Sequence, residues 1–265
     1  MAIVDLQIAN GIAEVVLNRP AQKNALSKEM FETIAAVGEE LKTTVGLRAV
    51  ILSGAGGNFC SGLDMAFMGA MAGQQDSLRT TLLNPPDGEK ANWFQKPAYV
   101  WQELSVPVIA AVEGVCLGGG LQIALAADFR IARPDARLSI MEAKWGLIPD
   151  MGISQSLPKL MRADRAKMLM MRAEMFSGAQ ALEEGLVTEL SDAPVTRARD
   201  LAAAIVNRSP EAIEGIKTLV ETVWTMPAAA GLSREAEIQA PIIGGPNQME
   251  AVMAAMQKRQ PKFET

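Results

Sequence analysis

Hydrophobic and polar residues follow one another along the chain in a way that predicts strands first and helices last. The largely apolar segments 3–9 and 12–18 flank Asn10-Gly11, a dipeptide that tolerates positive φ, and they therefore predict a β-hairpin. Ser27 precedes apolar residues at helical spacing, which predicts an N-capped amphipathic helix. The apolar positions of that helix are Met30, Ile34, Val37 and Leu41.

Further along the chain, the apolar runs 48–54 and 106–114 predict two buried strands. Beyond residue 195 the pattern is wholly helical, with Pro210 and Pro227 at the breaks between segments. The segment 72–97 is the least patterned and is interpreted either as a mobile flap or as a surface loop. We therefore expect a core over residues 1–195 and a helical region over 196–265.

Composition narrows the function classes. The chain has 265 residues, long enough for one large core, and 49% hydrophobic with 21% charged residues is typical of soluble globular proteins. The net charge of −5 and the absence of a Lys/Arg cluster argue against nucleic-acid binding. The longest apolar tract, 106–127, is interrupted by proline, glutamate and glycines, so no membrane association is expected.

Because Asp5 lies inside the first apolar run, we do not expect a signal peptide there, and a cytoplasmic location is expected. Two cysteines, Cys60 and Cys116, fit a reducing compartment without a disulfide framework. The sequence contains no histidine, which excludes Ser-His-Asp and Cys-His machinery and histidine zinc sites, and no metal is expected. Acid–base chemistry must rest on Asp, Glu, Lys or the lone Tyr99.

Two glycine-containing motifs lead from apolar runs into helical patterns. In GNFCSGLDMAFM, residues 57–68, the helical pattern starts at Leu63, and LGGGLQIALAAD repeats the arrangement at Gly118 to Gly120. A loop entering a helix exposes unpaired N–H groups, and glycine lets a ligand approach the backbone. The two loops would supply two donors to one oxygen, which is an oxyanion hole. The alternative is that the glycines only permit tight helix–strand packing.

A third motif, LSIMEAKWGLIPDMG, places Glu142 and Asp150 eight residues apart in apolar surroundings. Burial there would raise both pKa values and allow proton exchange near neutral pH. The alternative interpretation makes Glu142 a solvated charge at a helix end and Asp150 a turn residue.

The ordered motifs NRPAQKNALS, NFCSGLDMAFM, PVIAAVEGVCLGGG, MEAKWGLIPDMG and FSGAQALEEGLV resemble those of the crotonase family, the enoyl-CoA hydratases and isomerases. The resemblance covers about residues 3–262. It implies an α/β (α+β) fold, a crotonase-like spiral of ββα units with the acyl-CoA site in the core. The helical C-terminal region would be a trimerisation region, giving a homotrimer or a hexamer built as a dimer of trimers.

The resemblance also implies roles for single residues. The N–H groups of Leu63 and Gly119 would form the oxyanion hole for a thioester carbonyl. Coenzyme A is part of the substrate, and no separate cofactor is expected. Its implied contacts are Lys23, Ala25, Leu26, Ser61, Asp64, Gly118, and, from the tail that reaches a neighbouring subunit, Lys258 and Phe263. A solvated basic tail is the alternative for the last two.

Gln122 departs from the family pattern, because family hydratases carry glutamate there and at the position of Glu142. A glutamine keeps the shape and can hold a water, but its amide exchanges no proton at neutral pH. Glutamate followed eight residues later by aspartate resembles the arrangement in dienoyl-CoA isomerases and in hydrolases of the 3-hydroxyisobutyryl-CoA type. We therefore predict Glu142 as principal base and Asp150 as its partner or second acid.

Three hypotheses follow from the sequence. The first is an acyl-CoA enzyme of enolate chemistry, either a hydratase or a double-bond isomerase. The second is a 3-hydroxyacyl-CoA thioester hydrolase that uses Glu142 and Asp150. The third is a catalytically silent acyl-CoA-binding protein, suggested by the missing second glutamate. The sequence leaves the acyl group and the pathway open.

Overall fold

Two sheets form the centre of the molecule. The structure is a computed structural model that describes residues 2–264. In these residues the larger sheet has six strands, in the order β1 (Val4–Ala9), β2 (Ile12–Leu17), β3 (Ala49–Gly54), β4 (Val108–Val112), β6 (Phe129–Ala132) and β9 (Glu189–Leu190). The smaller sheet has three, in the order β5 (Val115–Leu117), β7 (Arg137–Ser139) and β8 (Phe176–Ser177). Apart from the antiparallel pairs β1–β2 and β7–β8, neighbouring strands run parallel.

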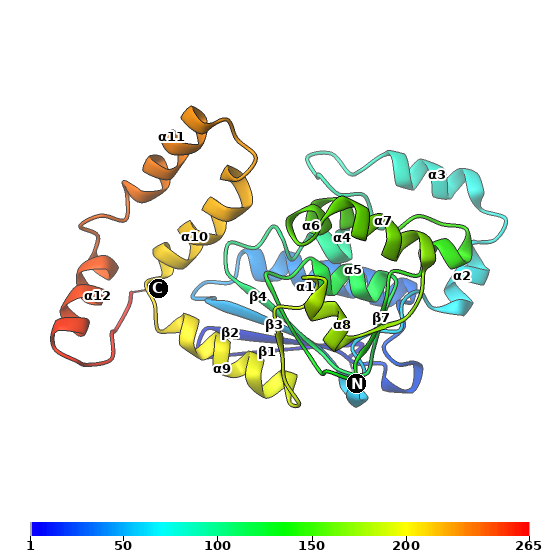
Figure 1. The fold of residues 1–265 in the computed structure, drawn as a ribbon, viewed down its shortest axis with the longest axis horizontal. Helices are drawn as coiled ribbons and strands as arrows, with labels where there is room; N and C mark the ends of the chain where they lie inside the picture. Colours follow the sequence, from blue (N-terminus) through cyan, green and yellow to red (C-terminus); the bar gives the residue numbers. More distant parts are fainter. Residues whose placement is uncertain (1, 265) are drawn as a thin grey trace.

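Helices follow most strands and cover the sheets (Figure 1). Those of the core are α1 (Lys28–Lys42), α2 (Met65–Met71), α3 (Gln75–Leu83), α4 (Lys96–Tyr99), α5 (Gly119–Leu125), α6 (Ile153–Ser156), α7 (Ala163–Arg172), α8 (Gly178–Glu183) and α9 (Pro194–Val206). Short 3-10 helices are η1 (Pro20–Gln22), η2 (Ala55–Gly57), η3 (Glu142–Trp145) and η4 (Leu157–Lys159). The last helices are α10 (Pro210–Val223), α11 (Ala228–Gln239) and α12 (Pro246–Met256).

The local signals in the first part of the sequence are confirmed. Asn10 and Gly11 have φ of 52° and 75° and join β1 to β2 in a tight hairpin. The Ser27 side chain accepts a hydrogen bond from the Met30 N–H at 3.2 Å and caps α1. These features depend on neighbours in the chain, so the sequence specifies them directly.

The central strands β3 and β4 are buried on both faces, which explains their uninterrupted apolar runs. One face belongs to the main core with α1, and Ile34 of α1 is fully buried there. The other face packs against Ala198 and Ala202 of α9. Sheet and helices thus form the predicted α/β core.

The segment 72–97 differs from the prediction, because residues 75–83 form α3. None of the α3 residues is buried, so this helix lies on the surface and contributes nothing to the core. The end of the segment is anchored: the Trp93 ring stacks on Phe31 at 5.1 Å between centroids, and Phe94 meets both rings edge-on. The helix expected from Leu63 begins at Met65, because Asp64 is its N-cap.

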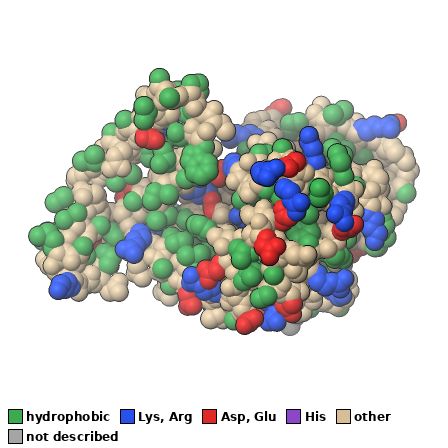
Figure 2. All heavy atoms as spheres, in the orientation of Figure 1, with side chains coloured by type: hydrophobic (Ala, Val, Ile, Leu, Met, Phe, Trp, Pro, Cys, Tyr) green, Lys and Arg blue, Asp and Glu red, His purple; other side chains and the backbone are tan. Residues whose placement is uncertain are grey.

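Helices α10, α11 and α12 project from the core as an arm (Figure 1). They confirm the predicted helical C-terminal region, although α9, which starts at Pro194, packs on the sheet. The division at residue 195 remains a prediction. Hydrophobic side chains are spread over the arm (Figure 2), and the exposed ones include Ile216, Val220, Trp224, Leu232, Ile243, Met249, Met253 and Met256. No helix within residues 2–264 is both long and apolar enough to cross a membrane.

Candidate functional site

The two glycine-containing loops lie side by side. The backbones of Cys60 and Cys116 form a parallel β-bridge. In it the Cys60 N–H donates to the Val115 carbonyl at 3.0 Å, and the Leu117 N–H donates to the Cys60 carbonyl at 2.9 Å. A Cβ on Gly62 would lie 2.8 Å from the Leu117 oxygen, so glycine is required for this approach, and its φ is +89°. Both cysteines are buried free thiols, as expected, and burial raises the pKa of Cys60 to about 12. They are too inert for nucleophilic chemistry.

Each loop offers a backbone donor without a partner. The Leu26 N–H donates to the Gly62 carbonyl and Leu26 accepts from the Asp64 N–H, so this pairing uses the residues on either side of Leu63 and leaves its N–H unused. Gly119 is the first residue of α5, where N–H groups have no intrahelical acceptor. Within residues 2–264, neither N–H has a hydrogen-bond partner. The arrangement fits the predicted oxyanion hole.

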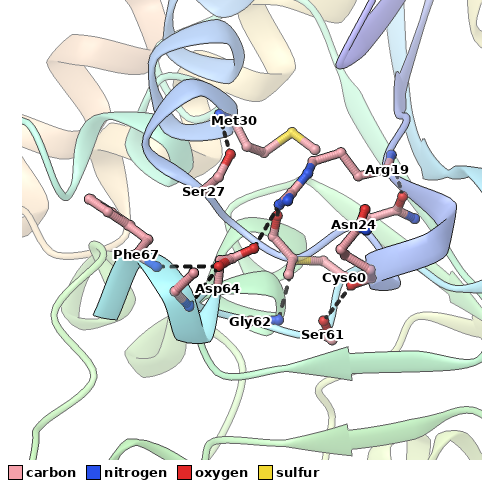
Figure 3. Close-up of polar contacts among 12 residues, drawn as sticks. Arg19, Asn24, Ser27, Met30, Cys60, Ser61, Gly62, Asp64 and Phe67 are labelled. Carbon is pink, nitrogen blue, oxygen red and sulfur yellow. Dashed lines mark hydrogen bonds and ion pairs between the residues drawn. The ribbon is translucent and has the colours of Figure 1, made fainter. Parts of the chain in front are cut away.

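Asp64 holds the first loop in place (Figure 3). Its carboxylate accepts from the N–H groups of Ala66 at 2.9 Å and Phe67 at 3.3 Å, and it pairs with Arg19 at 3.0 Å. The same Arg19 nitrogen donates to the Ala25 carbonyl at 2.6 Å. Burial by itself would raise the pKa of Asp64, but the hydrogen bonds from Arg19 and the helix outweigh it and lower that pKa. The side chain is occupied within the chain, so its predicted coenzyme A contact would fall to the backbone.

Asn24 organises the neighbouring loop and was missed by the sequence analysis. Its side chain donates to the Ala55 carbonyl at 3.0 Å and the Asn58 carbonyl at 2.7 Å, and accepts from the Arg19 N–H at 2.8 Å. Asn24 has a φ of 57° and Lys23 a φ of 48°. Asparagine tolerates this left-handed region, and this tolerance is the only signal the sequence carried.

The predicted coenzyme A residues fall into two groups, one in the loops around the candidate oxyanion hole and one in the C-terminal tail. Lys23 and Ser61 lie together, since the Ser61 N–H donates to the Lys23 carbonyl at 2.9 Å, and buried Ala25 and Leu26 follow in the same loop. Gly118 belongs to the adjacent loop. Their role stays a prediction.

The tail residues are elsewhere in this chain. Phe263 lies 5.9 Å from the Arg48 guanidinium, and Lys258 follows α12, where its N–H donates to the Ala255 carbonyl. Both follow the last helix, α12, in the chain. A role for them at a neighbouring subunit stays a prediction.

Glu142 opens η3 and points its carboxyl group at α5. Its Oε1 accepts from Gln122 Nε2 at 2.6 Å, whereas its Oε2 is buried and has no partner within residues 2–264. A Cβ on Gly118 would lie 3.4 Å from Oε1, which places the carboxyl group beside the second loop. Burial raises the pKa of Glu142; the hydrogen bond from Gln122 opposes that rise, and the charge of Asp150 adds to it.

Asp150 is the second carboxyl group of the site. Its residue is exposed, but partial desolvation still raises the pKa of its carboxyl group. Its negative charge also adds to the rise in the pKa of Glu142. Two neighbouring carboxyl groups with raised pKa values are suited to proton exchange near neutral pH.

Each of the two polar atoms of the Gln122 side chain has a hydrogen-bond partner within the protein. It is buried, with 2% of its surface exposed. Its Oε1 accepts the Met151 N–H at 2.8 Å while its Nε2 donates to Glu142. The sequence identified the position as a departure but gave no sign of these partners.

Exposed apolar residues follow Glu142. Trp145, Leu147 and Ile148 are 46%, 55% and 76% exposed, although each is large and hydrophobic. Apolar surface beside a polar site is typical of binding sites for ligands with an apolar part.

The chain is similar in sequence and in structure to enoyl-CoA hydratases and isomerases. Residues 7–265 match the family model of enoyl-CoA hydratase/isomerase. A peroxisomal Delta(3,5)-Delta(2,4)-dienoyl-CoA isomerase of Arabidopsis thaliana is 30% identical over 99% of this chain and 96% of its own. A mitochondrial methylglutaconyl-CoA hydratase of Mus musculus is 30% identical over 96% of this chain and 80% of its own. The crystal structure of an enoyl-CoA hydratase from Bacillus anthracis superposes with a TM-score of 0.88 at 29% identity, covering 99% of both chains.

Proposed function

Because the chain belongs to the enoyl-CoA hydratase/isomerase family, we propose that it transfers a proton on an acyl-CoA thioester through an enolate, with Glu142 as principal acid and base. The family and the fold are those expected from the sequence, and the protein is an enzyme of the hydratase/isomerase type. One observation carries the assignment to Glu142. Its buried Oε2 has no partner within residues 2–264, and its carboxyl group lies beside Gly118, which immediately precedes Gly119 and its free N–H.

The proposed reaction begins with the thioester oxygen between the N–H groups of Leu63 and Gly119. Glu142 Oε2 takes a proton from the carbon chain, the C–H electron pair moves into the thioester, and the two donors stabilise the resulting enolate oxygen. The proton returns to the same or another carbon. In hydration Glu142 instead takes a proton from water, whose oxygen bonds to the β-carbon of the enoyl ester. The π electrons form the enolate, and a proton added at the α-carbon completes the reaction. Asp150 is the partner that supplies or accepts a second proton. Loss of one such donor typically costs about 3–4 kcal/mol of transition-state stabilisation.

The remaining assignments belong to the same proposal. Coenzyme A lies against the loop that carries Lys23, and the acyl group lies toward the apolar residues after Glu142. No cofactor beyond the substrate is needed for this chemistry, and the proposed location is the cytoplasm. The names of the two relatives, an isomerase and a hydratase acting on CoA esters, support the substrate class.

The experiment is incubation in heavy water with saturated, 2-enoyl, 3-enoyl and 3-hydroxyacyl-CoA esters, followed by mass spectrometry. Deuterium incorporation, bond migration or water addition with the thioester intact supports the proposal and identifies the reaction. Release of free coenzyme A would replace it with the hydrolase hypothesis. Binding without any change in mass would identify a silent acyl-CoA-binding protein.

We also propose that the arm assembles three chains, or six as a dimer of trimers. The exposed apolar side chains of α10 to α12 are the support, since a soluble monomer rarely leaves so many uncovered. The mass in solution, measured by light scattering, should be three or six times 28.3 kDa. A monomeric mass at micromolar concentration would contradict assembly.

A further inference from the structure

The orientation of the Gln122 side-chain amide is fixed by the backbone. The Met151 N–H lies 2.8 Å from Gln122 Oε1 and can only donate, so the oxygen of the amide must face it. The amide nitrogen therefore faces Glu142 Oε1, at 2.6 Å. Because Gln122 is buried and satisfied at both atoms, it has no alternative arrangement of equal energy.

This orientation restricts where a proton can reside on Glu142. An amide N–H₂ group donates and cannot accept, so Oε1 must remain an acceptor whether Glu142 is ionised or protonated. A proton taken by Glu142 therefore goes to Oε2, the oxygen without a partner in the described chain. Resting on the function proposed above, we propose that Gln122 is a positioning residue that reserves Oε2 of Glu142 for the substrate proton.

Gln122 therefore does more than stand in place of an acidic residue. A buried carboxylate with two free oxygens would rotate and accept the proton on either one. The bond from Gln122 holds one orientation and supports the ionised form, which acts as the base. The charged side chain that acts on the Glu142 carboxyl group is Asp150, which the test leaves in place.

Two variants distinguish the hydrogen-bond donor of Gln122 from the shape of its side chain. Gln122→Met keeps the length of the side chain but removes donor and acceptor. Gln122→Glu keeps an acceptor for the Met151 N–H, and donates to Glu142 only while the two carboxyl groups share a proton. Gln155→Met on α6 is the matched control, because Gln155 is exposed and, among residues 2–264, its side chain donates only to the adjacent Ser154 at 3.2 Å.

The first readout needs no turnover. In protein labelled with carboxyl-¹³C glutamate, the Glu142 resonance is identified by its absence in Glu142→Gln. In Gln122→Met that resonance should titrate at a higher pH than in the wild type, because the bond that lowers its pKa is gone. Gln155→Met should leave it unchanged. An unshifted Glu142 titration in folded Gln122→Met would overturn the inference.

The second readout is the pH profile of deuterium exchange into the ester that the wild type processes. In Gln122→Met, kcat should fall about 10- to 100-fold with KM nearly unchanged. Relative to wild type, the activity of Gln122→Met should rise with pH, while that of Gln122→Glu should fall as its shared proton is lost. Parallel profiles would overturn the inference. If the wild type exchanges no ester but the Glu142 titration shifts, the positioning stands and the proposed function fails.

Discussion

Asp64 and Glu142 are carboxyl groups that flank the same pair of loops, yet their surroundings are opposite. Asp64 receives hydrogen bonds from Arg19 and from two helix N–H groups, and its pKa is lowered. Glu142 receives one bond from Gln122, keeps a buried oxygen without a partner, and has a raised pKa. A fully satisfied carboxylate stabilises the fold, whereas an incompletely satisfied one retains the capacity to take a proton.

The largest effect is expected from removing the Glu142 carboxyl group, and that effect is on catalysis. Glu142→Gln should slow exchange about 10²- to 10⁴-fold, the usual contribution of a positioned general base. It should not lower stability, since a desolvated charge is removed. Exchange rates and thermal unfolding measure the two effects, with exposed Glu174→Gln as the control. Full activity of Glu142→Gln on every processed ester would refute the assignment.

Substitution of Asp64 should have a smaller effect, which is on the free energy of unfolding. Asp64→Ala removes the cap of α2 and leaves Arg19 without its ion pair, and it should lower the free energy of unfolding by about 2 kcal/mol. Urea unfolding measures this change. Asp76→Ala, at the fully exposed start of α3, should cost less than about 0.5 kcal/mol. Equal losses in the two variants would mean that the Asp64 network is not structural.

The smallest effect is the pH dependence of stability. The folded pKa of Asp64 is lowered below 3.8, so its contribution is present above that pH and is lost as the pH falls through the folded value. The folded pKa of Glu142 is raised above 4.5, so its ionised form costs stability at neutral pH, and that cost disappears as the pH falls through the raised value toward 4.5.

Urea unfolding at a series of pH values tests both signs. Asp64→Asn should be less stable than the wild type at pH 7, and Glu142→Gln more stable, with both differences shrinking in acid. The difference for Glu142→Gln should vanish first, on approach to pH 4.5, whereas that for Asp64→Asn should persist to below pH 3.8. The same sign for both variants would contradict the comparison.

The sequence by itself determined the features that depend on chain neighbours or on ordered motifs. The hairpin at Asn10-Gly11, the cap at Ser27, the doubly buried β3 and β4 and the helical C-terminal region follow from local patterns. The fold and family followed from the resemblance of ordered motifs, which the comparisons support. Helix α3 was missed because it has only nine residues, with three leucines as its apolar positions, too short a run to establish a helical period.

Only the tertiary structure decided how the site residues interact. Asn24 bonds to carbonyls more than 30 positions away, and Gln122 joins Glu142 and Met151 across 20 and 29 positions. The physical reason is that hydrogen-bond direction and desolvation depend on atoms which converge from distant segments, and residue spacing carries no record of them. The sequence marked Gln122 as the place of a missing acid; the fold shows it donating a hydrogen bond to Glu142 and accepting one from Met151.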